Sequence, residues 1–204
     1  MTKRGVKIKI SDTTDCRKLV ELLENGDEVE VVEAAKQLAN LSLRQSVKPL
    51  IRLLEQGRTA HVRQFACYAL AWMSLPRLNP VFIECLRNRK ESEHVRGQAA
   101  EALGMLHGGG PSNSASNTYR AAEDLLIQSL SDESPVVRFW CCFALGCISS
   151  KRAVGPLSRL KVSDKALCPG MWYVREEASD SLDMIQGREP PDRIRIHRRF
   201  KSRK

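Results

Sequence analysis

Cysteine and histidine are the residues of this chain whose spacing would most easily reveal a metal site. Cys141, Cys142 and Cys147 lie close together, but they lack the two-residue gap between cysteines that is typical of zinc ligands. His61 and His94 occupy the same place in two successive copies of a repeated pattern, and stacked copies would hold them about 10 Å apart. One metal ion cannot bridge that distance. We therefore expect no metal and no cofactor, with the cysteines filling a core and the histidines at the surface.

Four arginines stand at equivalent places, each directly after a valine: Arg63, Arg96, Arg138 and Arg175. Such a column of guanidinium groups could bind anions. However, the start of a helix attracts negative charge rather than positive charge, so an arginine there needs an acidic partner. Asp132 and Glu133 precede Arg138, and Glu91 precedes Arg96. We therefore interpret the column as structural, with each arginine bonded to an acidic residue of its own turn or of the next repeat, and we assign no catalytic residue.

Aromatic residues occupy matched positions in the second and fourth copies of the pattern. Three and six residues after the valine, the second copy has Phe65 and Tyr68, and the fourth has Trp140 and Phe143. These positions lie off the face that carries small residues, so the rings are expected to line the inner, concave surface of the array. The candidate partner-binding residues are Phe65, Tyr68, Trp72, Gln98, Glu101, Phe139, Trp140 and Phe143.

The fifth copy has carboxylates where the second and fourth have rings. Glu177 and Asp180 stand there, so the concave surface is expected to become acidic towards the C-terminus. An alternative stays open for the rings, which could instead pack against the first helix of the neighbouring repeat.

The pattern that positions all these residues recurs along the chain. Valine is followed by arginine, by small residues four and seven positions later, and by leucine at the eighth, starting from Val62, Val95, Val137 and Val174. A degenerate copy starts at Glu30, and the successive steps are 32, 33, 42 and 37 residues. Positions zero, four, seven and eight share one face of an α-helix, and small side chains there let another helix approach closely. Self-similarity at this period indicates a repeat array of stacked helices.

Each copy is preceded by a second amphipathic segment, so the chain is predicted to form five helix pairs. The first helices are expected at about 15–24, 45–56, 79–88, 119–130 and 153–160, and the second helices at about 28–41, 60–73, 93–106, 135–148 and 172–185. Between them, residues 107–117 read HGGGPSNSASN, a composition that predicts a flexible and dispensable insertion. The domain organisation is then a basic lead-in over 1–12, a repeat domain over 13–187 and a basic tail over 188–204.

The net charge of +9 is unevenly distributed. Residues 1–9 carry +4 and residues 188–204 carry +6, which leaves the body at −1. Any binding of nucleic acid or another polyanion is therefore expected through the tails rather than the repeats. The candidate polyanion-binding residues are Arg193, Arg195, Arg198, Arg199, Lys201, Arg203 and Lys204.

Composition places the chain among cytoplasmic proteins with a packed core. Apolar residues make up 42% of the sequence, yet no apolar run approaches the roughly 20 residues that span a bilayer. The N-terminus is basic but lacks the apolar segment of a secretory signal. Seven cysteines, an odd number, suit a reducing compartment better than a disulfide framework.

The valine-arginine helix preceded by a leucine-rich helix resembles the HEAT repeat, and in particular the short HEAT-like type of the phycobilisome lyases. The resemblance covers about residues 13–187 and implies an all-α, right-handed α-solenoid. Relatives include scaffolds, lyase subunits, metal hydroxylases and DNA glycosylases, so the fold alone does not decide the function. Deoxyhypusine hydroxylases hold iron with His-Glu pairs, and this chain contains no His-Glu dipeptide. We also find no local motif that matches the tryptophan, aspartate and arginine set of the glycosylases.

The sequence therefore favours a non-catalytic, HEAT-like scaffold that binds a partner protein, of unknown identity, on its concave face. The resemblance implies one alternative, a bilin lyase or a lyase-accessory subunit. The tails suggest another, the binding of a polyanion or nucleic acid.

Overall fold

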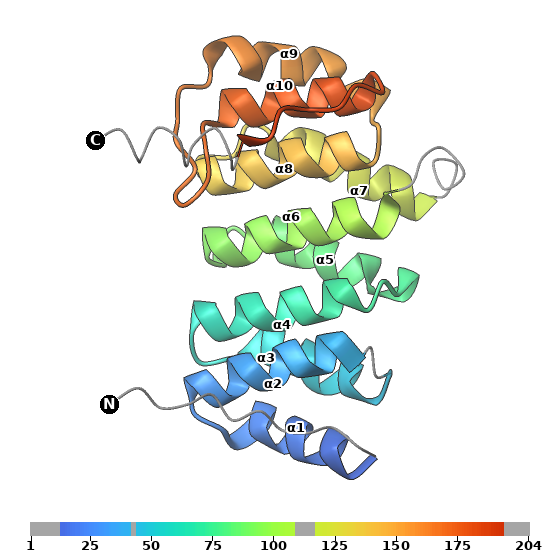
Figure 1. Cartoon of the computed structure of the whole chain (residues 1–204), viewed down its shortest axis with the longest axis vertical. Helices are drawn as coiled ribbons and strands as arrows, with labels where there is room; N and C mark the ends of the chain where they lie inside the picture. Colours follow the sequence, from blue (N-terminus) through green and yellow to red (C-terminus); the bar gives the residue numbers. More distant parts are fainter. Residues whose placement is uncertain (1–12, 42–43, 109–116, 194–204) are drawn as a thin grey trace.

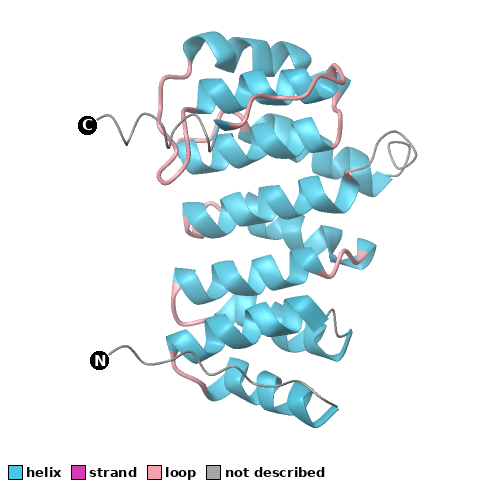
Figure 2. Cartoon of the chain, in the orientation of Figure 1, coloured by secondary structure: helices cyan, strands magenta, loops and turns pink. Residues whose placement is uncertain are grey.

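The computed structural model describes residues 13–41, 44–108 and 117–193, which form ten α-helices. These helices are α1 Thr13–Asn25, α2 Glu28–Leu41, α3 Val47–Gln56, α4 Ala60–Trp72, α5 Asn79–Arg87, α6 Glu93–His107, α7 Asn117–Ser129, α8 Pro135–Cys147, α9 Val154–Ser163 and α10 Val174–Ile185. Short 3-10 turns lead into three of the odd-numbered helices. Helices and loops account for the whole described chain, which has no named strand (Figure 2).

The helices form two layers. The even-numbered helices lie side by side in one layer. Of their odd-numbered partners, α3, α5 and α7 lie behind this layer, and α1 and α9 lie at the two ends of the array (Figure 1). Each even-numbered helix contacts the next one in the layer and also its own odd-numbered partner. The fold is therefore an all-α solenoid of five stacked helix pairs, as the repeated pattern predicts.

Small residues make the close stacking of the even-numbered helices possible. The residues four positions after the valine are completely buried, namely Ala66, Ala99, Cys141 and Ala178. Between α6 and α8 the approach is closer still. A Cβ added to Gly104 would stand 2.7 Å from the Cα of Ala144, so only glycine fits there.

Side-chain caps determine where several of the even-numbered helices begin. Thr59 accepts a hydrogen bond from the backbone N–H of Val62 at the start of α4. Ser134 does the same for the N–H of Val136 at the start of α8, where Pro135 fits the first turn because it needs no N–H partner. The valine-arginine pairs therefore lie in the first turn of each helix, next to the preceding loop.

The structure moves two of the expected boundaries. His107 is the buried last residue of α6, and its Nε2 lies 2.6 Å from the Oδ1 of Asn79, so it does not belong to the insertion. Asn117 likewise begins α7, and residues 109–116 lie outside the described residues, as do 1–12 and 194–204. The tail is also shorter than expected, because residues 188–193 run back along α10 (Figure 1).

Candidate functional site

The solvent-exposed side of the even-numbered helices carries the aromatic residues singled out by the sequence. It consists of the positions three, six and ten residues after each valine of the pattern, on α4, α6, α8 and α10. We call it the second-helix face. On α4, α6 and α8 these side chains are half-buried or exposed, whereas the positions that face the first helices are buried.

On α4 the rings form a continuous row. The centroids of His61 and Phe65 lie 4.8 Å apart, those of Phe65 and Tyr68 6.3 Å, and those of Tyr68 and Trp72 5.9 Å. Trp72 is 52% exposed, and the Lys36 ammonium of α2 stands 5.0 Å from the centre of the Phe65 ring. Such edge-to-face contacts hold the rings in fixed orientations while leaving one side in water.

On α8 the rings are seated more deeply. Trp140 and Phe143 pack edge to face at 5.6 Å, and both are half-buried. Trp140 also lies against α6, where a Cβ added to Gly97 would come within 2.8 Å of its Cδ1 atom. These rings therefore contribute to the contact between α6 and α8 and also to the surface.

Phe139 does not belong to this surface, contrary to the sequence-based expectation. It is only 1% exposed, and its ring packs against Trp140 and Trp172, both at 5.4 Å. Phe139 comes one position earlier in the helix than Trp140, and this rotation of about 100° carries its ring towards α10 and the loop before it. Phe139 is a core residue.

Gln98 and Glu101 place polar atoms on α6, between the two aromatic helices. Both side chains are half-buried, and the Gln98 amide donates a hydrogen bond to the Glu101 carboxylate. Burial raises the pKa of Glu101, although the Gln98 hydrogen bond opposes this. The carboxylate is thus partly removed from water on a surface otherwise lined by rings.

On α10 the carboxylates that were expected to form an acidic surface are buried. Glu177 and Asp180 are 3% and 5% exposed. The Trp172 indole N–H donates to Glu177 at 2.9 Å, and Arg193 donates to both Asp180 oxygens at 2.8 Å. Burial, together with the nearby Asp180 charge, raises the pKa of Glu177 to about 8.

Arg193, a candidate polyanion-binding residue, donates hydrogen bonds to Asp180 of α10. Besides Asp180 it donates to Glu176 at 3.2 Å, so its guanidinium is engaged by α10. Arg188, the other tail arginine in the described chain, pairs with Asp183. The remaining candidates, Arg195, Arg198, Arg199, Lys201, Arg203 and Lys204, lie outside the described residues.

The arginine column is structural at three of its four positions. Arg63 pairs with Glu91 at 2.8 Å, Arg96 with Asp132 at 2.6 Å and Arg138 with Asp164 at 2.7 Å. Each bond reaches forward to the turn or loop of the next repeat, which confirms the interpretation from the sequence.

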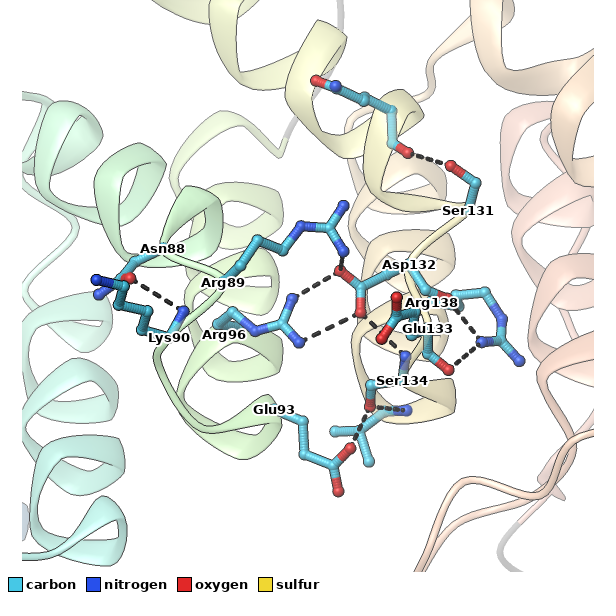
Figure 3. A network of polar contacts seen from close by, with 12 residues as sticks. Asn88, Arg89, Lys90, Glu93, Arg96, Ser131, Asp132, Glu133, Ser134 and Arg138 are labelled. Carbon is cyan, nitrogen blue, oxygen red and sulfur yellow. Dashed lines mark hydrogen bonds and ion pairs between the residues drawn. The ribbon is translucent and has the colours of Figure 1, made fainter.

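Figure 3 shows the pair around Asp132, whose carboxylate also receives Arg89 and the backbone N–H of Ser134. Burial opposes its ionisation, but the hydrogen bonds from Arg96 and Ser134 outweigh this and lower the pKa of Asp132. The fourth arginine differs, since Arg175 is exposed and lies 4.9 Å from the centre of the Tyr173 ring.

Cys67, Cys141 and Cys142 are completely buried, as expected of core residues, whereas Cys147 is half-buried and lies on the second-helix face. His61 and His94 are exposed, as expected. Within the described residues no group of three or more His, Cys, Asp or Glu side chains could hold a metal ion. None of the described helices is both long and apolar enough to cross a membrane.

Stacked helix pairs with arginines that link successive repeats define an α-solenoid. A family model described as HEAT repeats matches residues 16–104 and 79–182, so the chain belongs to the HEAT-repeat family.

Several solved structures share this fold. One is the complex of CpcE and CpcF of phycocyanin lyase from Nostoc sp. PCC7120, at 19% identity and a TM-score of 0.66, covering 83% of this chain and 99% of that one. Two engineered proteins are similar at 23% and 22% identity, with TM-scores of 0.56 and 0.54. The matches cover 84% and 87% of this chain and 79% and 49% of the engineered chains. No curated protein matches the sequence.

Proposed function

We propose that this HEAT-repeat chain is a scaffold that binds a partner protein through the second-helix face over α4, α6 and α8. The observation that carries the proposal is the row of rings on α4, which ends in a tryptophan that is 52% exposed. Large aromatic residues dominate the binding energy of protein interfaces, and leaving them in water is unfavourable. The half-buried Trp140 and Phe143 extend the aromatic surface to a second helix.

A binding role suits the rest of the molecule. The arginine pairs tie successive repeats together, so the α4, α6 and α8 surfaces are held in fixed relation to one another. A preorganised surface loses less conformational freedom when it binds. The similar CpcE and CpcF proteins form a complex with each other, and this supports partner binding by this chain.

Among the described residues, no contact or cluster supports either of the two alternative functions. The likeness to phycocyanin lyase subunits is one of fold at 19% identity, so it suggests no bilin chemistry here. For polyanion binding, both arginines of the described tail are engaged by carboxylates of this chain.

Site-specific photocross-linking tests the proposal directly. Benzoylphenylalanine would replace Trp72 in one variant and Val162 of α9 in a control, because Val162 is apolar and 80% exposed but lies outside the second-helix face. Irradiation in the native host should join a discrete protein to position 72 and not to position 162. That protein, once purified, should bind the Trp72→Ala chain more weakly by on the order of 2 kcal/mol.

Two results would contradict the proposal. Identical cross-linked products from both positions would show that exposure alone explains capture. Unchanged affinity of the purified protein for Trp72→Ala would place its binding surface elsewhere on the chain.

A further inference from the structure

Equivalent positions on the second-helix face form rows that run across the solenoid. Six residues after the valine, successive even-numbered helices have Tyr68, Glu101, Phe143 and Asp180. The four helices contact one another in that order. Rings and carboxylates therefore alternate along this row, on helices that stack about 10 Å apart.

One carboxylate of the row already binds a guanidinium. Arg193 approaches Asp180 from the chain that runs back along α10, and it donates from Nε to Oδ2 and from Nη2 to Oδ1, each at 2.8 Å. This two-bond arrangement is the geometry in which arginine recognises a carboxylate most specifically. A segment outside the helices therefore binds this position of the repeat through an arginine.

Glu101 holds the same position two even-numbered helices earlier and has no such partner. Among the described residues its side chain makes no ion pair with lysine or arginine, and its hydrogen-bond donor is Gln98. Neighbouring helices place Tyr68 and Phe143 on either side of it in the row, and both rings are half-buried. A carboxylate between two rings offers a guanidinium both charge and aromatic faces to stack on.

We propose that Glu101 binds an arginine of the partner protein, with Tyr68 and Phe143 flanking its guanidinium and the apolar neighbours of that arginine resting on the α4 rings. This inference deepens the proposed function, because it names the chemistry of the segment that the face takes. The planar guanidinium is preferred over the lysine ammonium because it forms two parallel bonds to the carboxylate and stacks on rings. Arg193 on Asp180 is the intramolecular example of the same contact.

The test uses two libraries of nine-residue peptides, acetylated and amidated at their ends, with randomised uncharged residues around a fixed centre. The centre is arginine in one library and citrulline, its uncharged isostere, in the other. Binding of each library to the full chain is measured by fluorescence anisotropy. The variants are Glu101→Gln and the control Glu133→Gln, whose exposed carboxylate lies in the turn before α8.

The arginine library should bind the unmodified chain about tenfold more tightly than the citrulline library, since a charge-assisted pair is lost with the charge. Glu101→Gln should remove this difference, and Glu133→Gln should keep it. Equal binding of the two libraries, binding of neither, or a preference that survives Glu101→Gln would each overturn the proposal.

The failure of this inference is separable from failure of the proposed function. If both libraries bind equally and Tyr68→Ala weakens both, the face binds peptides without using an arginine. If the arginine preference persists in Glu101→Gln and grows in Arg193→Ala, which leaves Asp180 without its guanidinium partner, the binding position is at α10 rather than α6.

Discussion

The same repeat positions are exposed to solvent over α4, at one end of the second-helix face, and buried over α10, at the other end. Over α4 the positions carry rings that remain in contact with water, and Trp72 is 52% exposed. Over α10 they carry Glu177 and Asp180, which are buried beneath Trp172 and Arg193. The same helix register therefore produces an open surface at one end and a closed one at the other. What differs is the chain on either side of α10, because Trp172 of the preceding loop contacts Glu177 and residues 188–193 run back over the helix.

The two carboxylates on the α10 part of the second-helix face are covered by other side chains of this chain. Here Arg193 neutralises Asp180, and the Trp172 indole hydrogen-bonds to Glu177. The α4 to α8 surface has no equivalent covering segment among the described residues, which is the feature expected of a binding face.

The largest effect should separate core rings from surface rings. Phe139→Ala should lower the free energy of unfolding by about 3–5 kcal/mol, because its ring is 1% exposed and packs on two tryptophans. Trp72→Ala should cost less than about 1 kcal/mol, since about half of this residue is already exposed to water. Urea unfolding of both variants measures this, and equal losses would abolish the distinction between the two groups.

The next effect depends on pH. The pKa of Glu177 is raised to about 8 in the folded chain from an unfolded value of 4.5. Between these two pH values the folded state holds a proton that the unfolded state has released, so stability falls as the pH rises. Glu177→Gln removes this cost and still accepts the Trp172 hydrogen bond.

The variant should therefore be more stable than the unmodified chain by on the order of 3 kcal/mol at pH 8.5, and of nearly equal stability near pH 4.5. Urea unfolding at the two pH values checks this. A stability difference that does not change with pH would show that Glu177 does not titrate in this range.

A smaller effect concerns the segment that closes α10. Arg193→Ala should cost about 2 kcal/mol, because it leaves Asp180 buried without its partner. Arg188→Ala is the matched control, since Arg188 is exposed and its pair with Asp183 should contribute less than about 1 kcal/mol. Thermal unfolding of both variants gives the comparison, and equal small losses would mean that the segment does not hold α10.

The helices could be predicted from the sequence because the same residue pattern recurs in five successive helix pairs. All ten expected helices are present, and three of the four arginines of the column have the predicted structural role, with carboxylate partners that lie in the next repeat. The helical periodicity does not predict whether Phe139 is exposed or buried, because the same side of a helix can face either water or a neighbouring loop. In the structure Phe139 packs against Trp172, a loop residue outside the repeat pattern, so the pattern does not predict this contact.

The contacts of residues 188–193 with α10 are also difficult to predict from the sequence. Composition predicts that a short basic segment stays in solvent, and charge alone does not show that Arg193 matches two carboxylates of α10. One feature of the sequence does indicate the contact. Glu176 and Asp180 are separated by one helical turn, and an arginine follows them across Gly187, which has a positive φ of 71° and so reverses the chain.

The most direct test of the binding face measures stability and partner affinity on the same variant, Tyr68→Ala. If the α4 rings form a binding surface, the free energy of unfolding should fall by only about 1 kcal/mol, because the Tyr68 ring is half-buried. The free energy of binding to the partner captured at position 72 should weaken by about 2 kcal/mol. If the ring is instead core, the same substitution should cost about 3–5 kcal/mol of stability. A stability loss of that size, with no change in affinity, would contradict the account.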